Sequence, residues 1–190
     1  MSKPKLVVLG FLHRAPMYGY QIGHVTESFG LPVWAGIKLP SIYKALQDLD
    51  ASQHIRGEQI TEGNNPPRTV FHINAKGRKF LAEMVRQNLS SASVNSQDWW
   101  LTLSFAWQTV SREFLAEAIQ NRLAKLKNKM MRAQDSVYQE LPEVGQLPFT
   151  HNHILNLGLR HHRVEMQTLK ELLDDVLTND HHDFFTDKGV

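Results

Sequence analysis

The sequence contains no cysteine, so disulfide bonds and thiolate chemistry are excluded. It also lacks a long hydrophobic run. The apolar stretch "LVVLGFL" at 6–12 is too short to span a bilayer, and it is followed by His13 and Arg14 rather than by the small residues of a signal-peptide cleavage site. We therefore expect a buried helix here, in a cytoplasmic protein without membrane contact.

Motifs of catalysis are missing as well. We find no glycine-rich phosphate loop, no nucleophile elbow and no HExxH sequence. The neighbouring carboxylates Asp174 and Asp175 would point to different sides of a helix, so they do not form an acid and base pair. We expect no enzymatic activity and no cofactor.

Ten histidines raise the alternative of a metal-responsive regulator. Two groups could supply imidazole and carboxylate ligands: His161 and His162 with Glu165, and His151 with His153. No repeated ligand spacing is visible, however, so we predict no metal site.

Acidic residues are scarce in the first half of the chain. Residues 1–90 hold 11 Lys and Arg against 6 Asp and Glu, and residues 91–190 hold 10 against 13. A net charge of +5 in the first half attracts polyanions at long range. Nucleic acid is therefore the first partner to consider for this half, beside the plainer interpretation of a solvated basic surface.

Hydrophobic periodicity in residues 1–90 predicts helices at 5–14, 19–29 and 39–52 and a further helix that begins after Asn74, which would cap it. Between the last two, "IRGEQITE" and "RTVFHIN" alternate like strands around the turn sequence "GNNPP". Three helices, a hairpin and a helix are the order of a winged helix-turn-helix. The predicted fold is mainly α with a small β-hairpin wing at 55–75 and a recognition helix at 39–52.

Three segments also carry a family resemblance. "PMYGYQI" at 16–22, "SIYKALQDLD" at 41–50 and "PPRTVFHINAKG" at 66–77 resemble, in order, the conserved segments of the PadR family of transcriptional regulators. The resemblance implies a DNA-binding winged helix, a helical dimerisation domain, and repression released by a small effector. It also implies that Tyr43 donates its hydroxyl to a DNA phosphate and that Arg68 in the wing reaches the minor groove or its phosphates.

Further DNA contacts are predicted from the polar face of the 39–52 helix. Ser41 and Lys44 lie one turn apart near its start, where base edges or nearby phosphates come within reach. Backbone contacts are expected from a second set of residues. The full predicted DNA-binding set is Tyr18, Lys38, Ser41, Tyr43, Lys44, Arg68 and Lys76.

The second half begins with a linker-like run, "SSASVNSQD" at 90–98, and a short apolar helix, "WWLTLSFAW". Two long helices follow, with apolar positions at alternating spacings of 4 and 3. The first seam comprises Ile119, Leu123, Leu126, Met130, Ala133 and Val137, and the second comprises Leu155, Leu159, His162, Met166, Leu169, Leu173 and Val176. We expect these helices to form a homodimer interface, which would let two recognition helices read an inverted repeat.

Three tryptophans, Trp99, Trp100 and Trp107, cluster in this half, and Trp100 and Trp107 would share one helix face. Aromatic compounds could bind there, although such a cluster is more often part of a core or an interface. We therefore place a small aromatic ligand at this cluster as a hypothesis only.

The expected domains are a winged helix-turn-helix at 1–90, a helical dimerisation and effector domain at 91–180, and a tail at 181–190. The expected function is that of a homodimeric repressor of transcription. The alternative outside this class is a winged helix used for protein contacts, without sequence-specific DNA binding.

Overall fold

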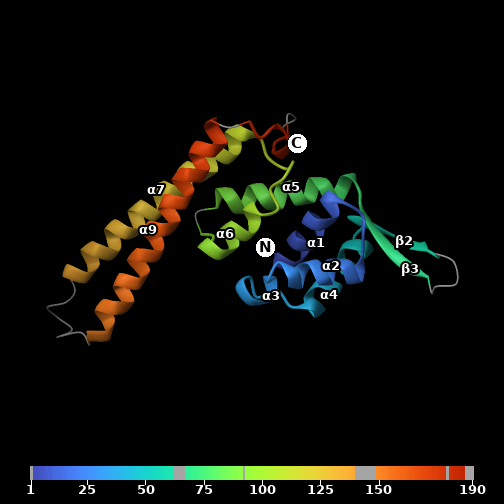
Figure 1. Cartoon of the computed structure of the whole chain (residues 1–190), viewed down its shortest axis with the longest axis horizontal. Coiled ribbons are helices and arrows are strands. Elements are labelled where there is room, and N and C mark those ends of the chain that lie inside the picture. Colours follow the sequence, from blue (N-terminus) through green and yellow to red (C-terminus); the bar gives the residue numbers. More distant parts are fainter. Residues whose placement is uncertain (1, 62–66, 92, 140–148, 179, 187–190) are drawn as a thin grey trace. The chain divides into compact units, whose positions relative to one another are not determined.

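The computed structural model describes residues 2–61, 67–91, 93–139, 149–178 and 180–186. The chain divides into two compact units, Met1–Ser111 with Asp183–Val190, and Arg112–His182. Within the described residues, no helix is long and apolar enough to cross a membrane. Figure 1 labels the helices and strands of both units.

The first unit begins with α1 (Lys3–Arg14), β1 (Met17–Tyr18), α2 (Gly19–Ser28), α3 (Leu31–Trp34) and α4 (Leu39–Ala51). It continues with β2 (Ile55–Ile60), β3 (Arg68–Ile73), α5 (Ala75–Ser90) and α6 (Ser96–Leu103). The structure confirms a mainly helical winged helix-turn-helix, with α4 in the predicted place of the recognition helix and β2 and β3 in the place of the wing. Most of the turn sequence "GNNPP" lies outside the described residues.

The centre of this unit is α1, whose residues 6–12 are all buried, as the all-round apolar sequence predicts. α4 packs on α1 with Ile42, Ala45, Leu46 and Leu49, and Pro40 stands in its first turn, where no backbone donor is needed. Asn74 caps α5 as predicted, because its Oδ1 accepts from the Gly77 backbone N–H at 3.0 Å.

The sheet has one strand more than the predicted hairpin. β3 lies between β2 and β1, antiparallel to both, with Ile55 opposite Ile73 on one side and Met17 opposite Phe71 on the other. β1 has only two residues, too few for an alternating pattern. It ties the start of α2 to the base of the wing.

The first unit extends beyond the predicted boundary at residue 90. Trp99 of α6 is fully buried and donates its indole N–H to the Leu89 carbonyl at 3.2 Å. Phe105 packs so closely on α1 that a Cβ at Gly10 would lie 2.2 Å from its ring. The compact unit therefore runs to Ser111, and the linker-like composition of 90–98 does not separate it from α6.

The predicted tail at 181–190 is also ordered in part. A 3₁₀ helix spans His182–Phe184, and the Gln108 backbone N–H donates to the Phe184 carbonyl at 2.7 Å. The Thr186 N–H donates to the Val110 carbonyl at 3.1 Å. These backbone bonds place residues 183–186 in the first unit. No local sequence pattern predicts that they pair with residues 108–110.

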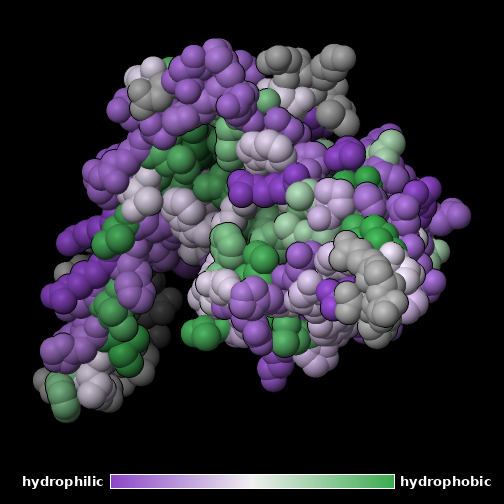
Figure 2. Space-filling model, turned by 45° about the vertical axis from the view of Figure 1, so that its right-hand side comes forward, coloured by the Kyte–Doolittle hydropathy of each residue, from purple (hydrophilic) through white to green (hydrophobic). Residues whose placement is uncertain are grey.

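The second unit is a hairpin of α7 (Arg112–Gln139) and α9 (Phe149–Thr178), which pack on one another. The predicted seam of α9 lies on its inner, buried or half-buried side, and so does the part of the α7 seam from Ile119 to Met130. The side chains of Ala133 and Val137 lie outside the described residues. Hydrophobic residues nevertheless also show on the visible outer surface of these long helices (Figure 2).

Candidate nucleic-acid interface

The first half of α4 presents its polar side chains outward. The Lys44 side chain is 77% exposed, and its Nζ lies 3.9 Å from Asp48 Oδ1. Such a loose surface pair contributes little, so the lysine stays available for an anion. Ser41 Oγ donates to the Lys38 carbonyl at 2.6 Å, which tightens the first turn, and Lys38 itself is exposed at the N-cap position.

Tyr43 lies between packing and solvent. Its ring is partly exposed, and a Cβ at Gly23 of α2 would stand 3.4 Å from its hydroxyl oxygen. The glycine therefore lets α2 and α4 approach while the phenol stays at the surface. This geometry suits the predicted phosphate donor, because the hydroxyl is anchored by its ring but has not been removed from solvent.

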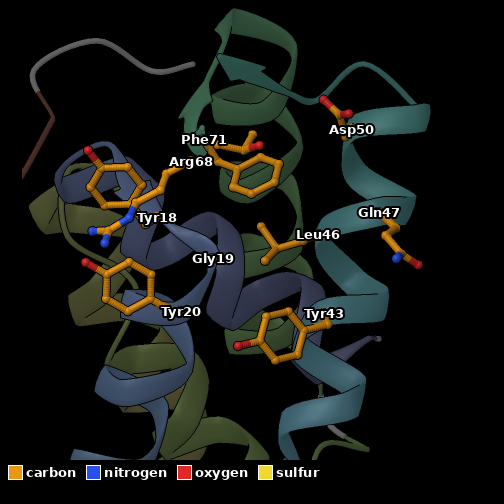
Figure 3. A pocket seen from close by; sticks show the side chains of 10 residues that line it. Tyr18, Gly19, Tyr20, Tyr43, Leu46, Gln47, Asp50, Arg68 and Phe71 are labelled. Atoms are coloured by element: carbon orange, nitrogen blue, oxygen red, sulfur yellow. The ribbon is translucent and has the colours of Figure 1, made fainter. Parts of the chain in front are cut away.

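Arg68 is the first residue of β3, next to the turn of the wing, and lies among aromatic rings. Its guanidinium carbon lies 5.9 Å from the centre of the Tyr20 ring, and Tyr20 stacks on Tyr18 with centres 5.6 Å apart. Figure 3 shows the guanidinium directed between these two tyrosines. The cation is thus held near a fixed position rather than left on a free side chain.

Helix and wing meet around a hollow of about 410 Å³. Tyr43, Leu46, Gln47 and Asp50 of α4, Arg68, Thr69 and Phe71 of β3, and residues 18–20 line it. The one carboxylate in this set, Asp50, accepts from the Gly57 backbone N–H at 3.2 Å. The structure therefore brings Tyr18, Tyr43 and Arg68, three of the predicted DNA-binding residues, to one surface.

The sequence comparisons bear on this surface. Residues 8–83 match the model of the transcriptional regulator PadR-like family. By this match, residues 8–83 resemble a PadR-like domain. The match contains α4, both strands of the wing and every predicted DNA-binding residue. No curated protein gives a significant match to the sequence.

Several solved structures are similar to a larger part of the chain. Bacillus subtilis PadR in complex with operator DNA is 18% identical over 90% of this chain and 98% of that one, with a TM-score of 0.40. The same protein in complex with p-coumaric acid is 18% identical over 93% and 97%, with a TM-score of 0.40. Protein smu.1604c from Streptococcus mutans UA159 is 21% identical over 89% and 97%, with a TM-score of 0.42. Because these scores are low, the domain assignment rests on the family model and the topology.

Lys76 belongs to α5, and its side chain lies beside the C-terminal end of α4. Its Nζ donates to the carbonyl of Ser52, the C-cap residue of α4, at 2.7 Å. A cation there satisfies a terminal carbonyl and complements the helix dipole. This contact gives Lys76 a structural role, and its predicted contact with DNA stays a prediction.

The expected arrangement of the tryptophans is wrong in one respect. Trp107 does not continue the helix of Trp100, because α6 ends at Leu103 and the following backbone bonds are turns, such as Phe105 N–H to the Thr102 carbonyl at 3.0 Å. Trp107 instead lies against His13 and Arg14. Trp99 contacts Trp100 edge-on at 5.3 Å, but it is a core residue and cannot line an open site.

The histidine-rich segments form no metal centre in the described part of the chain, where no three His, Asp or Glu side chains converge as metal ligands would. The His151 side chain lies outside the described residues. Burial, together with the charge of Lys129, lowers the pKa of His162, while Glu165 nearby acts in the opposite direction.

Two residues of the interface are absent from the predicted set. Tyr20 is 54% exposed, and its ring lies beside the guanidinium group of Arg68. Gln47 lies on the outward face of α4 beside the hollow. The position of Gln47 follows from helical spacing alone, whereas the partner of Tyr20 depends on the pairing of β1 with β3.

Proposed function

We propose that this chain regulates transcription by binding double-stranded DNA through α4 and the wing of its PadR-like domain. The observation that carries the proposal is the shared hollow, where the outward face of α4 and Arg68 of β3 border one surface. In a winged helix-turn-helix the recognition helix enters the major groove and flanking elements hold the backbone. Lys38 and Lys44 add exposed positive charge at the start of α4.

Fluorescence anisotropy with labelled DNA from the region upstream of the protein's own gene tests this proposal. Binding should weaken steeply as salt rises, and it should survive an excess of scrambled competitor DNA. Absent or salt-insensitive binding by a folded protein would favour the protein-interaction module instead.

Point substitutions locate the surface. Lys44→Ala and Arg68→Ala should each weaken binding and lower the slope of log Kd against log salt by about 0.9 for each phosphate that the variant no longer neutralises. Neither should lower Tm, because both side chains are exposed. Lys127→Ala, an exposed lysine of α7, is the matched control and should bind like the wild type. Normal binding by Lys44→Ala or Arg68→Ala would remove that residue from the interface.

We further propose that the protein acts as a homodimer through the second unit. The predicted seams pack within one chain, so they do not by themselves require a partner. The outer face of α9 supports the proposal instead: Ile154, Leu157 and Val164 share that face, and Val164 is 67% exposed. A two-fold partner would cover this stripe and present two copies of α4 to an inverted repeat.

Sedimentation equilibrium tests the homodimer. Leu157→Glu combined with Val164→Glu should shift the protein toward monomer, because the partner would have to bury two carboxylates. Asn156→Glu, which places the same charge on another face of α9, should leave the dimer intact. A wild-type monomer at all concentrations would contradict the proposal.

Repression, and its release by a small aromatic ligand, stay predictions of the family resemblance. Trp100 and Trp107 are half-buried and could report such a ligand, while buried Trp99 could contact it only if the core opened. A Trp fluorescence titration with phenolic acids that shows no saturable change would count against the ligand site.

A further inference from the structure

The polar side chains on the outward face of α4 differ in what they already bind. The Ser41 hydroxyl donates to the Lys38 carbonyl, Lys44 lies near Asp48, and the Asp50 carboxylate accepts from the Gly57 N–H. Each of these groups would rearrange or share its partner on meeting DNA. Gln47 is the exception on this face.

Within the described part of the chain, the Gln47 amide makes no hydrogen bond, ion pair or ring contact. The residue is exposed and follows Ser41 and Lys44 at intervals of three, which keeps it on the same side of the helix. In Figure 3 its side chain extends from α4 away from the rings of Tyr43 and Phe71. A DNA base can therefore approach the amide without breaking a bond inside the protein.

The amide also has the right chemistry for one base. It offers a donor and an acceptor side by side, and adenine presents the complementary acceptor N7 and donor N6–H₂ in the major groove. Lysine and arginine only donate, so they match guanine or phosphate, and a carboxylate only accepts. The free group on α4 thus matches an A·T pair better than any other.

We propose that Gln47 of α4 selects one A·T pair in the DNA site, by paired hydrogen bonds to its adenine in the major groove. The proposal rests on the proposed function, because it needs α4 in that groove. Lys44 and Arg68 would then supply attraction to phosphates that does not depend on sequence, and Gln47 would supply discrimination.

Selection of binding sites from random-sequence DNA tests the assignment, with the wild type and Gln47→Ala treated in parallel. We expect the wild type to enrich a motif with a fixed A·T pair in each half-site, and Gln47→Ala to lose that fixed position while keeping the others. Affinity for the wild-type motif should fall about tenfold or more, and affinity for scrambled DNA should change by less than about twofold. Gln120→Ala, another exposed glutamine on a helix, is the matched control.

A base analogue tests the contact itself. Replacing the selected adenine with 7-deazaadenine removes the N7 acceptor and leaves base pairing intact. This change should weaken wild-type binding and leave Gln47→Ala binding unaltered, because the variant has no amide to lose. An equal loss in both proteins would overturn the assignment.

The possible failures are distinguishable. If the wild type selects a motif and Gln47→Ala selects the same motif with equal affinity, Gln47 is not the selecting residue and the proposed function stands. If the wild type selects no motif, sequence-specific binding fails and the assignment fails with it.

Discussion

The two units of the chain differ in the side chains that they bury and expose. The first unit packs its other helices and its strands around α1 and exposes polar and cationic groups along α4 and the wing. The second unit has two long helices, buries an ion pair between them and leaves apolar side chains exposed on α9. The polar face of α4 is exposed in the first unit, whereas an outer face of α9 in the second unit carries a stripe of exposed apolar side chains.

The buried ion pair shows how the hairpin differs from an ordinary apolar seam. Arg122 Nη2 lies 3.0 Å from Glu165 Oε1, with the two side chains only 4% and 10% exposed. Neither charge is stable in such a place without the other. We therefore expect the pair to fix the register of α7 against α9, because apolar contacts alone would allow other registers.

The largest effect is expected from breaking this pair. Glu165→Ala leaves the Arg122 guanidinium buried without its carboxylate, and we expect it to lower the free energy of unfolding by about 3–5 kcal/mol. Urea denaturation followed by circular dichroism measures the loss, and hydrogen exchange should locate it in α7 and α9. Glu117→Ala, an exposed glutamate of α7, should cost less than about 0.5 kcal/mol. Equal behaviour of the two variants would show that the pair does not hold the hairpin.

Each unit has a helical glycine, one closely packed and the other with open space beside it. Gly10→Ala would drive a methyl group into Phe105, and we expect a loss of about 1–3 kcal/mol. Gly158 of α9 has no atom within 4 Å of the added Cβ, so Gly158→Ala should stabilise the helix by up to about 1 kcal/mol. Thermal unfolding of both variants checks the two signs. A neutral Gly10→Ala would mean that Phe105 can move away from α1 at little cost.

Features that depend on local pattern could be predicted from the sequence. The helical periodicity of α4, the two strands β2 and β3 and the cap at Asn74 each depend on a short stretch of sequence, and the structure confirms them. The seams of α7 and α9 are also visible in the sequence. The sequence of a seam does not show whether it packs within its own chain or against another chain, however. Here the two seams pack on one another within one chain.

Features that depend on distant partners could not be predicted. The third strand, the extension of the first unit to Ser111 and the bond from Lys76 to Ser52 each join segments that no local window contains. In the interface, helical spacing placed Lys44 and Ser41 correctly on the outward face of α4. The stack of Tyr18, Tyr20 and Arg68 required the pairing of β1 with β3.

The smallest expected effect is a pH dependence that originates in the first unit. Burial lowers the pKa of His13, the charge of Arg78 lowers it further, and the Trp107 backbone acts in the opposite direction. The pKa of a histidine in the unfolded chain is about 6.5, so just below that pH the unfolded chain binds more protons than the folded protein. Stability is therefore constant above about pH 6.5 and falls as the pH drops below it. Burial also lowers the pKa of His54 and His162, so the wild type should lose stability through all three groups. His13→Asn should lose less between about pH 8 and pH 5, as measured by urea denaturation at each pH. A constant difference between the two proteins across that range would show that His13 does not contribute.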